Sequence, residues 1–136
     1  MALRTEIDWK AVATGALAAL VGASVVLVAV LIIEATIDIS NDSNIFFPLY
    51  LLVLLSMAYG GYVAARSEVK TPLLHGSLAP VPAFLVILVI AVAVKLAKGT
   101  AWHISSLVLV EIFNLFMSMT AGMLGGRLAQ RRLSHR

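Results

Sequence analysis

The residue best suited to chemistry is a carboxylate inside an apolar stretch that is long enough to cross a membrane. Glu111 lies between Val110 and Ile112, and Asn114 and Ser118 follow it three and seven residues later. This spacing places the three polar residues on one face of a helix. An ionised carboxylate at such a depth costs about 2.5 to 3.5 kcal/mol, so we expect Glu111 to be protonated, paired or hydrated.

Three roles are open for this polar stripe, which we define as Glu111, Asn114 and Ser118. The first is structural, with a neutral glutamic acid that hydrogen-bonds across a helix bundle, and we favour it. The second is the docking of a partner protein. The third is passage of a proton or an ion, with Asn114 as hydrogen-bond partner and Lys95 or His103 as nearby charges.

The remaining polar residues give no catalytic pattern. The chain has no cysteine, which excludes disulfides and thiolate metal sites. The polar connection after residue 33 carries Glu34, Asp38 and Asp42, but it lacks the spacing of a calcium loop and we expect it to be solvated. No Ser/His/Asp set, HExxH motif or phosphate-binding glycine loop occurs. The sequence therefore predicts no enzyme, no cofactor and no metal site.

Apolar residues dominate the elements that must position the stripe. The 136 residues are 61% hydrophobic and only 12% charged. Four apolar stretches, at about 9–33, 45–65, 72–96 and 101–126, are each as long as the roughly 20 residues that cross a bilayer as a helix. We expect an all-α fold, with residues 1–136 forming a single transmembrane domain that is an integral membrane four-helix bundle.

Basic residues predict the orientation of these spans. With four spans, the segments before the first, between the second and third and after the fourth share one side, and they carry most of the lysines and arginines, including Arg66, Lys70 and the arginines after residue 126. The positive-inside rule then places both termini in the cytoplasm. Topology and contact with the lipid bilayer explain the net charge of +3, so we expect no nucleic-acid partner.

The second half of the chain repeats the first. The run Lys10–Ala18 aligns with Thr71–Ala79, which matches Gly15 with Gly76, and the glycine pair 60–61 aligns with the pair 125–126. Two spans per unit make these tandem hairpins parallel repeats, for which we expect a pseudo-twofold axis along the membrane normal. Under this alignment the stripe matches Phe46, Leu49 and Val53, so it belongs to one half only.

Small residues at a spacing of four indicate where helices approach each other in lipid. These packing positions are Gly15, Gly22, Ser56, Gly60, Ala64, Gly76, Ala121, Gly125 and Ala129. We favour packing within a compact monomer, and an oligomer or a docking face is the alternative. Pro80 and Pro82 predict a break in the third span, which we interpret as a kink that fits a neighbouring helix, with a hinge or an ion-coordinating break as the alternative.

The run Gly60–Arg66 followed by Pro72–Gly76 resembles the hairpin linker of small four-span bacterial membrane proteins with a duplicated transmembrane hairpin, over most of the chain. This resemblance implies a bacterial inner membrane and offers no activity to carry over. The chain is also similar to the duplicated proteolipid subunit of rotary proton pumps in its four spans and its single carboxylate, Glu111, in the last one. It lacks that family's dense glycine register and polar loop, so this likeness is an analogy.

The scarcity of polar chemistry and the abundance of small residues predict a function through helix faces. We expect an accessory or assembly subunit that contacts another membrane protein. The alternative is a small homo-oligomeric channel or a proton-coupled transporter that uses Glu111.

Overall fold

The computed structural model describes residues 7–36, 44, 46–67, 70–97, 99 and 104–135. Helices are the only regular secondary structure in these ranges, which confirms the all-α prediction. The helices are α1 (Trp9–Thr36), α2 (Phe46–Ala65), α3 (Pro72–Leu78), α4 (Pro80–Ala97) and α5 (Ile104–Leu133).

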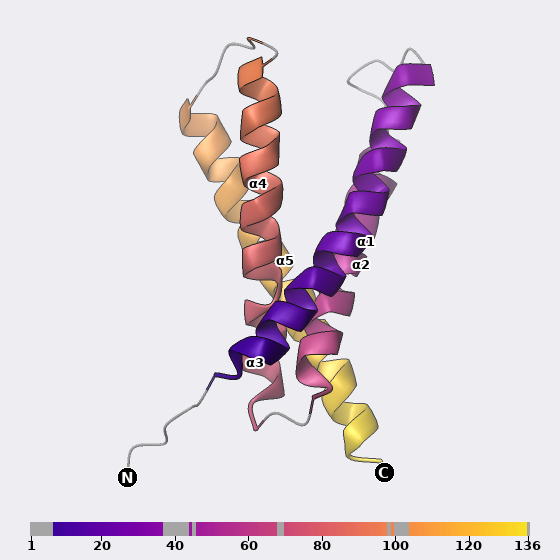
Figure 1. Ribbon diagram of the computed structural model, residues 1–136, viewed down its shortest axis with the longest axis vertical. Helices are drawn as coiled ribbons and strands as arrows, with labels where there is room; N and C mark the ends of the chain where they lie inside the picture. Colours follow the sequence, from indigo (N-terminus) through magenta and orange to yellow (C-terminus); the bar gives the residue numbers. More distant parts are fainter. Residues whose placement is uncertain are drawn as a thin grey trace.

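The helices form a V (Figure 1). One arm consists of α1 packed along α2, and the other contains α4 and the first part of α5. The arms converge at the end where α3 lies, and there α5 crosses to pack against both α2 and α3. The expected bundle is therefore closed at the end where α1 begins and α5 terminates, and it is open at the other end.

Four segments within the described residues are long and apolar enough to cross a membrane. They are Trp9–Ile33, Phe47–Ala65, Pro72–Ala97 and Val108–Leu133. The accessible surface is 9605 Å², compared with about 6,900 Å² for a compact soluble monomer of this size. Large aliphatic side chains cover much of it, with Leu17, Val21 and Val25 each about two-thirds exposed. Such a surface suits lipid as the surrounding solvent.

The last helix differs from its predicted span. We expected the fourth span to end near residue 126, yet α5 continues to Leu133. Hydropathy falls at Arg127, but the residues from there to Leu133 include no glycine or proline and are compatible with a helix. The extra two turns carry Arg131 and Arg132 beyond the apolar part of the helix.

The third span is divided at Ala79 into α3 and α4, although Ala79 keeps helical backbone angles, so the kink at Pro80 and Pro82 stays a prediction. Proline has no backbone N–H, so Pro80 leaves the carbonyl of Gly76 without its helical hydrogen bond. That carbonyl faces Gly122 of α5, where a Cβ would meet it. Because Gly122 has no side chain, its backbone lies next to the Gly76 carbonyl, and α3 packs directly on α5.

The residues before α1 and α3 differ in how they cap these helices. Asp8 caps α1, because its Oδ1 accepts the backbone N–H of Lys10 at 3.0 Å and of Ala11 at 3.2 Å. Thr71 occupies the cap position of α3, before Pro72, but its side chain makes no capping hydrogen bond. The Thr71 hydroxyl lies 3.2 Å from Nδ1 of His75 instead.

Candidate functional site

The predicted packing residues of the first hairpin lie between α1 and α2. A Cβ on Gly15 would stand 2.5 Å from the carbonyl oxygen of Gly60 and 2.6 Å from Cβ of Ala64. One on Gly22 would stand 2.7 Å from Oγ of Ser56. The two backbones touch here because no side chain separates them, so these residues form a contact inside the chain.

The second hairpin closes through similar contacts between α3 and α5. A Cβ on Gly76 would stand 2.8 Å from the carbonyl oxygen of Gly122 and 3.0 Å from Cα of Gly126. Ala129 of α5 is 1% exposed, and Ala121 packs against the buried cluster that contains Met57. Of these, Gly122 and Gly126 were not among the predicted packing positions.

The two hairpins are joined by α2 and α5. Added Cβ atoms on Gly61 and on Gly125 would collide with the carbonyl oxygens of Gly122 and Ala58, respectively. Gly125 is a predicted packing residue, whereas Gly61 is one position away from the α2 seam of Ser56, Gly60 and Ala64, which faces α1. Sequence spacing identified one small-residue face of α2 and missed the second.

The polar stripe of α5 faces α2 through a residue that the sequence analysis did not single out. The hydroxyl of Tyr50 donates a hydrogen bond to Oδ1 of Asn114 at 3.1 Å. Ser118 is 4% exposed, one turn nearer the closed end of the V. A tyrosine in an apolar span is usually assigned to the membrane interface, so only its position opposite Asn114 would have revealed this bond.

Glu111 lies at the open end of the stripe and is half-buried. It is close enough to Tyr50 to interact electrostatically, but it forms no hydrogen bond or ion pair within the part of the chain that the structure describes. Of the two charges considered for it, Lys95 lies in the last turn of α4 and His103 lies outside the described residues. The favoured structural role, a bond across the bundle, has no partner among the described side chains.

A cleft of about 440 Å³ separates the arms of the V. We call it the inter-arm cleft, and α1, α2 and α4 line it with mainly aliphatic side chains. These include Leu20, Val26, Val30, Val53, Ile87 and Ile90. Tyr50 is also part of the lining, so its hydrogen bond to Asn114 lies at the edge of an otherwise apolar space. Glu111 is one helical turn from Asn114 along α5.

Among the described residues, no group of three His, Asp or Glu side chains could hold a metal ion. His75 is 1% exposed between α1 and α3. Its Nε2 accepts the backbone N–H of Asp8 at 2.8 Å, so Nδ1 carries the proton and donates to the carbonyl oxygen of Thr71 at 2.8 Å. This histidine holds the start of α1 against α3 and is structural.

Replacing His75 with alanine is expected to lower the free energy of unfolding by about 2 kcal/mol, because the buried N–H of Asp8 loses its acceptor and a cavity forms. Thermal unfolding in detergent micelles measures this change. Ser77→Ala in the same helix removes only a local bond to the carbonyl of Leu74 and should change stability by less than about 0.5 kcal/mol. Equal losses in the two variants would contradict the structural role of His75.

The geometry thus joins Asn114 to Tyr50 in the wall of the cleft, with Glu111 one helical turn away on α5, and the small residues make contacts within the chain. No protein-family model, curated protein or solved structure matches the chain.

Proposed function

We propose that this chain is an accessory or assembly subunit of a membrane complex, and that it binds one transmembrane helix of a partner protein in the inter-arm cleft. The observation that carries the proposal is Glu111, a carboxyl group without a hydrogen-bonding partner among the described residues, which interacts electrostatically with Tyr50 in the wall of an open apolar cleft. A polar group in lipid favours an interhelical hydrogen bond, and a partner helix with a donor at this depth supplies it.

The use of the small residues supports the same proposal. Close helix approach in lipid needs small side chains, and here Gly15, Gly60, Gly61, Gly122 and Gly125 already contact neighbouring helices of the chain itself. These faces are therefore not free for a partner. The cleft walls of α1, α2 and α4 remain, with half-exposed aliphatic side chains such as Ile90 and Leu27.

The proposal includes a duplicated hairpin in a bacterial inner membrane with both termini in the cytoplasm. Two sets of contacts support the duplication, because Gly15 lies against Gly60 and Ala64 as Gly76 lies against Gly122 and Gly126. This correspondence pairs Gly60 with Gly122. The sequence alignment instead pairs Gly60 with Gly125, which is three residues further along α5. Arginines at the closed end of the V support the orientation, by the positive-inside rule.

A second candidate function, proton-coupled transport or a small channel, is favoured by one specific observation. Glu111 lies beside the Tyr50–Asn114 hydrogen bond, so protonatable and hydrogen-bonding groups are adjacent at one depth. In liposomes this function predicts proton flux that Glu111→Gln abolishes. Absence of flux from the unaltered protein leaves the accessory proposal as the one to pursue.

Site-specific photo-crosslinking in the native membrane tests the accessory proposal. Ile90 lines the cleft and is 47% exposed, whereas its neighbour Val89 is 67% exposed and does not line it, so a crosslinking amino acid disturbs the core at neither position. We expect position 90 to capture one protein that also co-purifies in a fixed ratio, and position 89 to capture lipid. Capture of a second copy of this chain, or of lipid alone, at position 90 would contradict a foreign partner helix.

A further inference from the structure

A basic pocket lies at the closed end of the V, between the C-terminal ends of α2 and α5. It has a volume of about 670 Å³ and is lined by Tyr62, Arg66, Arg131, Arg132 and His135 together with aliphatic residues of α5. Among the described residues that line it there is no acidic side chain. The three arginines form no ion pair within the described ranges, so their charge is available to an anion.

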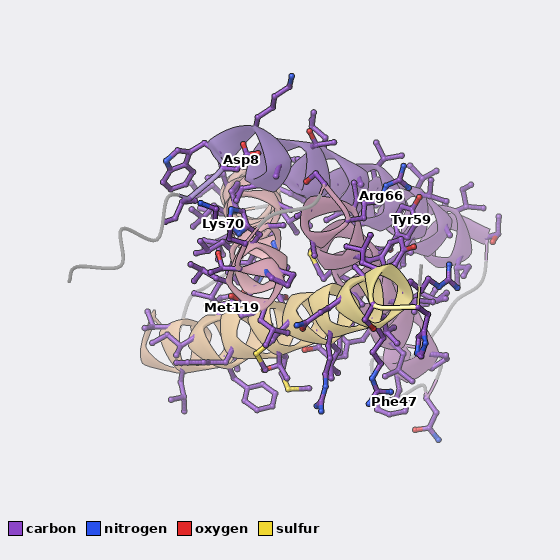
Figure 2. The ribbon with its side chains drawn as sticks, turned by 90° about the horizontal axis from the view of Figure 1, so that it is seen from below. Asp8, Phe47, Tyr59, Arg66, Lys70 and Met119 are labelled. Atoms are coloured by element: carbon purple, nitrogen blue, oxygen red, sulfur yellow. The ribbon has the colours of Figure 1, made fainter. Side chains whose placement is uncertain are left out.

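An apolar groove of about 610 Å³ adjoins this pocket along α2 and α5. Leu55, Ala58 and Tyr59 line it, and it shares Tyr62, Leu128 and Arg132 with the basic pocket, so the two spaces have a common wall. Seen from below, Tyr59 and Arg66 are both on the side of α2 where the C-terminal part of α5 lies (Figure 2).

The order of residues along the two helices matches the order of groups in a phospholipid. Along α2, Leu55 and Tyr59 of the groove precede Arg66, and along α5 Leu128 precedes Arg131 and Arg132. Both helices run toward the closed end of the V. The apolar groove thus points into the span and the arginines lie at its end, where a bilayer places its headgroups.

Tyr62 holds one of these arginines in place. The guanidinium carbon of Arg132 lies 5.7 Å from the centre of the Tyr62 ring, and its Nη1 lies 3.4 Å from the tyrosine hydroxyl oxygen, to which it donates. Tyr59 stacks on Tyr62 with ring centres 6.5 Å apart. A guanidinium held on an aromatic face loses less conformational entropy when it binds a phosphate.

We propose that the basic pocket and the apolar groove together bind one anionic phospholipid of the leaflet at the closed end of the V. The arginines bind its phosphate by charge-assisted hydrogen bonds, and one acyl chain lies in the groove against Leu55, Ala58 and Leu128. A soluble phosphate or a nucleic acid would use the arginines but not the groove. The position of the groove directly beside the pocket therefore favours a lipid.

Lipid retention measured by native mass spectrometry tests this site. The protein is purified from nanodiscs that contain phosphatidylglycerol and phosphatidylcholine in equal amounts. We expect one phosphatidylglycerol to remain bound to the unaltered protein, and Arg132→Gln to weaken its binding about five-fold, as removal of one basic group at a membrane surface does. Arg127→Gln, on the same helix but outside the pocket, is the matched control and should retain the lipid.

Three results would overturn the proposal. Equal loss of lipid in Arg127→Gln and Arg132→Gln would indicate diffuse attraction, and equal retention of phosphatidylcholine would remove the role of the arginines. Binding of glycerol phosphate, which has no acyl chain, as tightly as phosphatidylglycerol would identify a site for a soluble anion. Comparing these ligands on the unaltered protein keeps the test decisive if a variant fails to fold.

Discussion

Gly61→Leu is expected to lower the free energy of unfolding by about 3 kcal/mol, at the upper end of the usual cost of overpacking a core. A Cβ at this position would collide with the backbone carbonyl of Gly122, which cannot rotate away as a side chain can. Leucine is the better helix former, so the intrinsic helix propensity acts in the opposite direction. Because α2 and α5 join the arms of the V, the loss would separate the two hairpins.

Thermal unfolding in micelles and the distance between the arms, measured with spin labels, check this expectation. Ala13→Leu is the matched control, since Ala13 is exposed on α1 and the added side chain meets lipid or detergent. We expect Ala13→Leu to change stability by less than about 0.5 kcal/mol. A stable Gly61→Leu variant with an unchanged arm separation would show that the α2–α5 contact is not what joins the hairpins.

The elements of the fold follow from hydropathy. In lipid, helices satisfy the hydrogen bonds of their own backbone N–H and C=O groups, whereas an open sheet leaves those at its edges unpaired. The starts of α1 and of the third span agree with the prediction, with Trp9 and Pro72 as first residues. The V could not be predicted. Small-residue spacing shows which faces can approach but not which neighbour each one chooses, so the seam of Gly60 met α1 while Gly61 met α5.

The candidate site was predicted in part. A carboxylate in an apolar span is conspicuous in the sequence, and Asn114 at helical spacing placed it on a polar stripe. The partner across the helix, Tyr50, required the three-dimensional register of α2 against α5. The burial of His75 likewise depended on where α1 begins relative to α3, a distance of 67 residues in sequence. Contacts between distant segments carry no local signal in a single sequence.

Glu111→Leu is expected to leave the stability of the isolated protein unchanged within about 0.5 kcal/mol, because the carboxyl group makes no hydrogen bond with any described residue. The same substitution should weaken retention of the partner protein about tenfold or more, which corresponds to one lost hydrogen bond to a charged group. Glu111→Gln keeps an amide that can still bond and should retain most of the partner. Thermal unfolding and quantitative co-purification measure the two effects separately.

Asn114→Leu provides the contrast, because Asn114 already accepts the Tyr50 hydroxyl at 3.1 Å. Its loss is expected to destabilise the isolated chain by about 1 kcal/mol, the usual contribution of one such bond. A structural role for Glu111 predicts the same result at position 111, with Glu111→Leu destabilising and the partner weakened only in proportion. We expect Glu111→Leu to lose the partner without losing stability, and Asn114→Leu to lose stability. These two results would show that Glu111 docks the partner and that Asn114 holds α2 and α5 together.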